Sequence, residues 1–145
     1  MRRLVAVVVA GLALAGCGGA SHTPTTSGAG AEAKAQITSA YESFFSDQTD
    51  VPAKVRLLQN GPRFERLIFG FTNNPLAVRV HVTVSSVTPE GPQRAKVVYQ
   101  VHFASASLPR QTGTAVKENG RWKVGDATLC QLVSLQGSTP AVCKP

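Results

Sequence analysis

With 145 residues, the chain has room for a single domain. Its 15 Lys and Arg side chains outnumber 8 Asp and Glu, which gives a formal net charge of +7. The basic residues are scattered, without a run of like charge or a series of aromatic residues among them, so we do not expect a nucleic acid partner. Most of them are expected to lie on a solvated surface; the alternative is a patch for anionic lipid headgroups or acidic envelope polymers.

The sequence begins like an export signal. Two arginines follow the first methionine, and the twelve residues Leu4–Ala15 contain no polar side chain. This run is too short for a stable membrane-spanning helix, which needs about 20 apolar residues. The sequence LAGC at 14–17 resembles the lipobox of bacterial lipoproteins, in which the cysteine receives a diacylglycerol and the chain is cut just before it.

The resemblance to a lipobox implies a signal peptide at 1–16 and a lipid anchor on Cys17. It also implies that the mature protein is held on the extracytoplasmic face of the cell membrane. The alternative is an ordinary signal peptide that is cut near Gly19 and takes Cys17 with it. Residues 17–31 are small and polar without an apolar period, so we predict a flexible tether there.

Three helices are predicted after the tether. Residues 32–46 carry apolar side chains at the spacing of one helical stripe. Asp50 is expected to cap a second, short helix, which Asn60 and Gly61 end. Pro62 is expected to begin a third helix that ends at 73–75. The three stripes consist of Ile37, Ala40, Tyr41, Phe44 and Phe45, then Val51, Val55 and Leu58, then Phe64, Leu67, Ile68 and Phe71.

In the second half, the apolar period changes from 3.6 to 2, which is typical of strands. We predict strands over 76–88, 94–107, 111–118 and 121–125. Asn119 and Gly120 join the last two, and this pair is a strong signal for a tight hairpin. Asp126 is then expected to cap a final helical segment.

Helices followed by an antiparallel meander predict an α+β domain over residues 32–145, in which N-terminal helices pack on a curved four-stranded sheet. This order, with the sequences AYESFF, LLQNGPRF and ENGRWKV, resembles exported actinobacterial lipoproteins and antigens with a cystatin-like, or nuclear-transport-factor-like, cone fold. The low-molecular-weight mycobacterial antigen family is similar in particular. The resemblance covers about residues 35–143 and implies a fold and a cell-envelope location, but no catalytic residue.

Two cysteines remain if Cys17 carries a lipid. In an oxidising compartment, Cys130 and Cys143 are expected to form a disulfide, whose loop closure would stabilise the C-terminus by about 3 kcal/mol. The alternatives are two free thiols or a metal-binding pair. Because no other Cys or His lies near at ligand spacing, we predict neither a metal site nor a cofactor.

An enzyme is one hypothesis, because cone folds of this class include isomerases, dehydratases and cyclases. Such an enzyme would need an acid–base pair inside the cone. His81 and His102 share strand faces with polar residues, so we expect both on the outer side of the sheet. Without a converging acid–base pair, we expect a protein that acts by binding and not by catalysis.

Two binding surfaces are predicted. The cone would enclose a lipid or another apolar ligand if its aromatic side chains do not fill it. If they do fill it, the outer face of the sheet would dock on an envelope protein or polymer, and the domain would be a structural or assembly subunit of a membrane complex. The candidate pocket residues are Tyr41, Phe45, Phe64, Tyr99, Phe103 and Trp122, and the candidate partner surface consists of Arg79, His81, Lys96 and His102.

Overall fold

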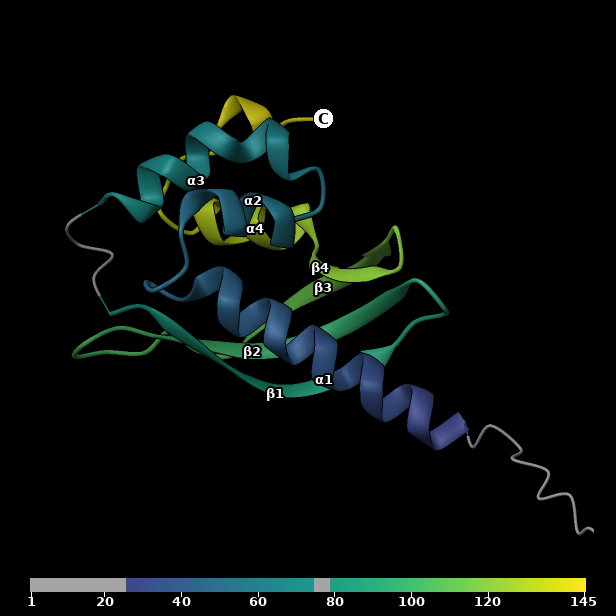
Figure 1. Cartoon of the computed structure of the whole chain (residues 1–145). Coiled ribbons are helices and arrows are strands. Elements are labelled where there is room, and N and C mark those ends of the chain that lie inside the picture. The colour runs from purple at the N-terminus through teal and green to yellow at the C-terminus, as the bar shows by residue number, and fades with distance from the viewer. Residues whose placement is uncertain (1–25, 75–78) are drawn as a thin grey trace, which may run out of the picture.

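The computed structural model describes residues 26–74 and 79–145. In these residues, a group of helices is followed by four consecutive strands and then by a C-terminal helical segment (Figure 1). The helical elements before the sheet are α1 (Thr26–Phe45), α2 (Val51–Leu57), the 3-10 turn η1 (Gly61–Phe64) and α3 (Glu65–Thr72). They are followed by β1 (His81–Pro89), β2 (Arg94–His102), β3 (Gln111–Glu118) and β4 (Arg121–Val124), then by α4 (Asp126–Ser134) and the 3-10 turn η3 (Ala141–Cys143).

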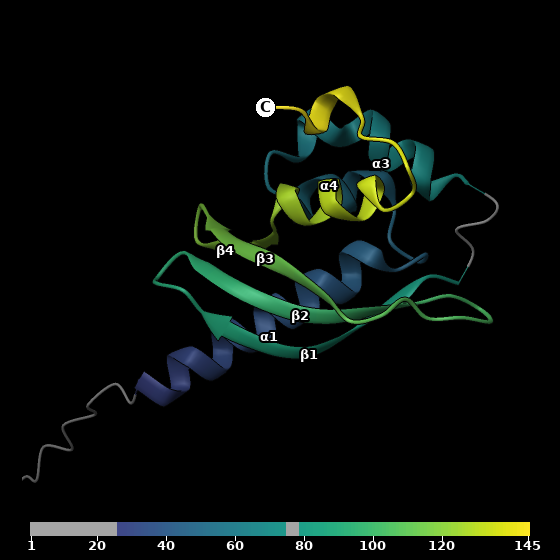
Figure 2. The ribbon, with the colours of Figure 1, turned by 180° about the vertical axis from the view of Figure 1, so that it is seen from behind.

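The strands form one antiparallel sheet in the order β1-β2-β3-β4. Helix α1 lies across one face of this curved sheet, whereas α2, α3 and α4 form a layer beyond α1 (Figure 1). Seen from behind, the sheet stands in front of α1 (Figure 2). The predicted α+β cone, with helices on a curved four-stranded sheet, is therefore confirmed.

The apolar stripe of α1 forms the centre of the core. Ile37, Tyr41 and Phe44 are buried against the inward-facing residues of β2, including Tyr99. The ring centroids of Tyr41 and Tyr99 lie 5.2 Å apart, and Phe45 stacks on Tyr99 at 5.8 Å. Each such side chain contributes about 1.5–3 kcal/mol when it is fully removed from water. The helical spacing of the stripe thus fixes α1 on the sheet.

Helix α1 begins at Thr26, six residues before the predicted start at Glu32. The last part of the predicted tether is therefore helical. Alanine has the highest helix propensity, and it occupies every second position from 29 to 35. The tether was predicted because these residues are small and polar without an apolar period, and that criterion does not register helix propensity.

Two strands are shorter than predicted. Strand β1 begins at His81, because Arg79 has a positive φ of 67° and turns the chain just before it. Its predicted first residues at 76–78 lie outside the described residues. Strand β2 ends at His102 and not at Ser107, because the main-chain N–H of Phe103 donates to the Ala106 carbonyl at 2.7 Å and closes a turn. The predicted second half of this strand folds back, so that His102 pairs with Ser107.

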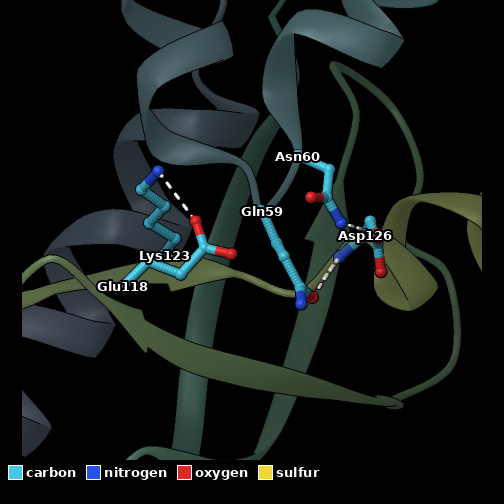
Figure 3. A network of polar contacts seen from close by, with 5 residues as sticks. All are labelled: Gln59, Asn60, Glu118, Lys123 and Asp126. Atoms are coloured by element: carbon cyan, nitrogen blue, oxygen red, sulfur yellow. Dashed lines mark hydrogen bonds and ion pairs between the residues drawn. The ribbon is translucent and has the colours of Figure 1, made fainter.

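The two predicted caps have different outcomes. Asp50 caps α2, since its carboxylate accepts a hydrogen bond of 2.8 Å from the main-chain N–H of Ala53. The prediction for Asp126 is wrong, because Gly125 is the N-cap of α4 and Asp126 is its first helical residue. The Asp126 carboxylate instead accepts a hydrogen bond of 2.8 Å from the Asn60 amide (Figure 3). The main-chain N–H of Asp126 also donates to Gln59, so the connection after α2 is tied to the start of α4.

The hairpin and the cysteine pair agree with the predictions. Asn119 and Gly120 have φ values of 51° and 75°, which a tight primed turn requires. An ion pair of 3.0 Å between Lys123 and Glu118 joins β4 to β3 next to this turn (Figure 3). Cys130 and Cys143 form a disulfide that holds the C-terminal residues against α4.

The predicted lipidation site Cys17 and the signal peptide lie outside the described residues. Within residues 26–74 and 79–145, no helix combines the length and the apolar character that crossing a bilayer requires.

Candidate ligand-binding cavity

A partly open cavity of about 510 Å³ lies between the helices and the sheet. Helix α1 contributes Phe44 and Phe45 from its C-terminal end, and α3 contributes Ile68 and Phe71. The remaining apolar wall comes from Val80 just before β1, from β2 and the loop that follows it, and from α4 and Leu135 just after it. These side chains point inward because they belong to the apolar stripes of their elements. Ligand pockets in proteins have volumes of about 300–1,000 Å³ and mostly apolar walls, so this cavity has the size and the chemistry of one.

The predicted pocket residues divide into two groups. Phe45 and Phe103 line the cavity. The structure places the other four, Tyr41, Phe64, Tyr99 and Trp122, in the packed core and not in the cavity wall. The aromatic side chains therefore fill the space between α1 and the sheet. The cavity lies on the side of Phe45 that faces the helical layer, where these aromatic side chains no longer occupy the space.

Two apolar residues of the wall remain exposed to solvent. Phe103, just after β2, is 38% exposed, and Leu135, just after α4, is 61% exposed. An exposed phenylalanine or leucine on its own needs no explanation. Phe103 and Leu135, however, both belong to the wall of one open cavity. They give its opening an apolar rim that an apolar ligand would contact as it enters.

Five polar residues enter the wall: Asp47, Lys54, Thr72, Asn74 and Gln136. Asp47, between α1 and α2, accepts a hydrogen bond of 3.0 Å from the main-chain N–H of Arg79. The hydrogen bond with the Gln48 side chain and, to a smaller extent, the one from Arg79 hold the pKa of the Asp47 carboxyl below its ordinary value. Asp47 is exposed and ionised, so it is a weak base at neutral pH.

Lys54 projects from α2 into the same wall and is half-buried. Desolvation lowers the pKa of its ammonium, and the charge of Asp47 opposes this shift. Among the described residues, the ion pair found is the one between Lys123 and Glu118. In this part of the chain, no carboxylate therefore contacts the Lys54 ammonium. Of the described residues in the wall, Lys54 is the one cation.

Thr72, the last residue of α3, has a buried hydroxyl oxygen without a hydrogen-bond partner in the described part of the chain. Most buried polar groups in proteins are hydrogen-bonded, and leaving one unsatisfied costs about 1–3 kcal/mol. Thr72 belongs to the cavity wall, but its hydroxyl oxygen is covered by the surrounding protein and is not exposed to the cavity.

The sequence interpretation missed Asp47, Lys54 and Thr72. A signal for the last two was nevertheless present. Lys54 stands three residues after Val51, and Thr72 stands four residues after Ile68, so both positions belong to predicted apolar stripes. A polar residue on an otherwise apolar stripe indicates a place where the buried side of a helix does not pack against the hydrophobic core.

Comparison with known proteins gives the family. The model for the low molecular weight antigen MTB12, C-terminal domain, matches residues 30–140. The chain belongs to this family. No curated protein sequence matches significantly. Among solved structures, an NTF-2 like protein of unknown function from Shewanella oneidensis MR-1 is similar, with 13% identity and a TM-score of 0.45 over 63% of this chain and 95% of that chain.

In this member of the MTB12 family, the predicted partner surface does not form one patch. His81 and His102 face each other across β1 and β2, and their rings stack with centroids 4.8 Å apart. Arg79 is exposed just before β1, near this pair in sequence. Lys96 shares the outer face of β2 with His102, but six residues separate them, which corresponds to about 20 Å along a strand.

The arrangement of ionisable groups bears on the chemistry of the cavity. Asp47 and Lys54 are the ionisable residues among the described residues of the wall, and neither histidine of the sheet lines it. In the described part of the chain, no three His, Cys, Asp or Glu side chains gather in a way that would hold a metal ion. The described part of the cavity thus offers an apolar wall with one cation, Lys54, and one carboxylate, Asp47.

Proposed function

We propose that this domain binds an apolar ligand in the cavity and acts by binding and not by catalysis. The observation that supports this proposal is an open cavity of about 510 Å³ with a mostly apolar wall. Protein interiors are normally packed as densely as organic crystals, and cavities lower the stability of the fold. A cavity of this size is therefore more consistent with a ligand site than with a structural subunit whose core is filled.

The proposal can be tested on the full chain with the neutral apolar dye N-phenyl-1-naphthylamine, whose fluorescence rises in an apolar environment. Val101 lies in the wall, so V101F would fill part of the cavity and lower the affinity for the dye. V98F is the matched control, because Val98 belongs to the same strand but faces the other side of the sheet. Equal dye binding by both variants and the unmodified protein, or no binding at all, would contradict the proposal.

We also propose that the protein is exported and anchored to the extracytoplasmic face of the cell membrane through a diacylglycerol on Cys17. The lipobox-like sequence before Cys17 supports this. Metabolic labelling with an alkyne analogue of palmitate should mark the unmodified protein and leave C17S unlabelled in the soluble fraction. Label that persists on C17S, or an unmodified protein without label, would exclude this anchor.

A further inference from the structure

The polar groups of the cavity wall indicate what kind of ligand it takes. An apolar ligand without a polar group would leave Lys54 facing hydrocarbon. Lys54 is held in the wall by its position on the apolar side of α2, which packs against α3. Removing a charge from water without a partner is costly. The wall therefore favours a ligand that supplies a partner to the ammonium.

Asp47 does not supply the partner for Lys54. Its carboxylate is already engaged by the main-chain N–H of Arg79, and it is exposed to solvent, where its charge is screened. It forms no ion pair with Lys54, although its charge acts on Lys54 from a distance. An anion inside the cavity would meet a half-buried ammonium that no carboxylate of the described residues contacts.

We propose that the ligand is a single-chain amphiphile with an anionic head, such as a fatty-acid carboxylate, whose head contacts the Lys54 ammonium while its chain lies on the apolar wall. This inference rests on the proposed binding function, because it names the ligand of the same cavity. Charge-assisted hydrogen bonds are about twice as strong as neutral ones, so the head decides which amphiphiles bind.

Three probes with the same chain and different heads test the inference on the unmodified full chain: dodecanoate, dodecanol and dodecyltrimethylammonium. Each is titrated below its micelle concentration against bound N-phenyl-1-naphthylamine. We expect dodecanoate to displace the dye at a concentration at least about tenfold lower than dodecanol, and the cation to be the weakest of the three. Equal displacement by all three heads would overturn the inference.

Variants of Lys54 test whether this residue is responsible for the preference. K54M should lower the affinity for dodecanoate at least about tenfold, to that of dodecanol, whereas K54R should retain most of it. K96M is the matched control for the loss of one positive charge, because Lys96 is exposed on the outer face of the sheet. If K96M lowers the affinity for dodecanoate as much as K54M does, the preference comes from the overall positive charge of the protein, and the inference is wrong.

The dye separates the two proposals: failure of the dye to bind would remove the cavity function and this inference with it. Dye binding in the cavity without discrimination among heads would remove this inference alone.

Discussion

The Tyr41 hydroxyl donates a hydrogen bond of 2.6 Å to the main-chain carbonyl of Thr114, which lies 73 residues later in the sequence. The Thr128 hydroxyl is 3.3 Å from the same tyrosine oxygen and accepts from the main-chain N–H of Thr114 at 2.9 Å. Through these contacts, α1, β3 and α4 meet at one buried point. Gly113 makes room for it, because a Cβ there would lie 2.7 Å from both the Tyr41 and the Thr128 hydroxyl oxygens.

Removing the Tyr41 hydroxyl should destabilise the domain. In Y41F, the free energy of unfolding should fall by about 1–1.5 kcal/mol, because a buried hydrogen bond is lost while the ring remains. Y99F is the matched control, since Tyr99 is equally buried but no hydrogen bond of its hydroxyl is found among the described residues. Urea unfolding of both variants measures the difference, and equal losses would show that the hydroxyl of Tyr41 has no special part.

Two glycine substitutions should have opposite signs. G113A should lower the free energy of unfolding by about 1–3 kcal/mol, because its Cβ forces the Tyr41 and Thr128 side chains apart. G70A should raise it by about 0.5–1 kcal/mol, since Gly70 lies in helix α3 with nothing within 4 Å of an added Cβ. Thermal or urea unfolding of the two variants checks both signs; a stable G113A would contradict the close approach at Thr128.

Alkaline pH should destabilise the domain through its two buried tyrosines. Burial raises the pKa of both Tyr41 and Tyr99 above the ordinary value of 10.0, and for Tyr41 the Thr128 hydrogen bond opposes part of the shift. Above about pH 10 the unfolded chain loses protons that the folded protein keeps, so unfolding becomes more favourable as pH rises. Stability from these groups is fully present below pH 10.

The slope measures the effect. Each tyrosine should contribute a loss of about 1.4 kcal/mol per pH unit above pH 10. Unfolding in urea at pH 9, 10 and 11 gives the slope of the unmodified protein, and Y41F or Y99F should each remove about half of the tyrosine part. An unchanged slope in both variants would assign the alkaline loss to other groups.

Opening the disulfide should lower stability without changing the fold. The bond between Cys130 and Cys143 spans 13 positions, for which loop closure predicts about 3 kcal/mol. The C130S/C143S variant should therefore unfold at a lower urea concentration, and the unmodified protein in dithiothreitol should behave in the same way. If the reductant destabilises the variant equally, the effect does not come from this bond.

Local sequence patterns predicted most elements, because a helix cap or a hairpin turn depends on residues a few positions apart. The Asp50 cap and the Asn119–Gly120 turn are of this kind. The start of β1 and the role of Asp126 were mispredicted because their partners lie far away in the sequence. Arg79 has a left-handed conformation next to a hydrogen bond with Asp47, 32 positions earlier. The Asp126 carboxylate accepts a hydrogen bond from Asn60, 66 positions earlier, so the residues near Asp126 in the sequence do not predict this contact.

The cavity is the part of the site that the sequence predicted least well. Aromatic residues on apolar faces correctly indicated a cone with an aromatic interior. Whether that interior is filled depends on how side chains from α1, α3, β2 and α4 fit together, which no single stripe determines. Phe45 borders the space and Tyr41, one turn earlier on the same stripe, does not.

Helix α1 separates the entry of the chain from the cavity. Its 20 residues correspond to about 30 Å, and its C-terminal residues Phe44 and Phe45 line the cavity, whereas its N-terminal turns project from the rest of the fold (Figure 1). If the protein is attached through its N-terminus, the ligand opening lies at the end of the domain away from the point of attachment.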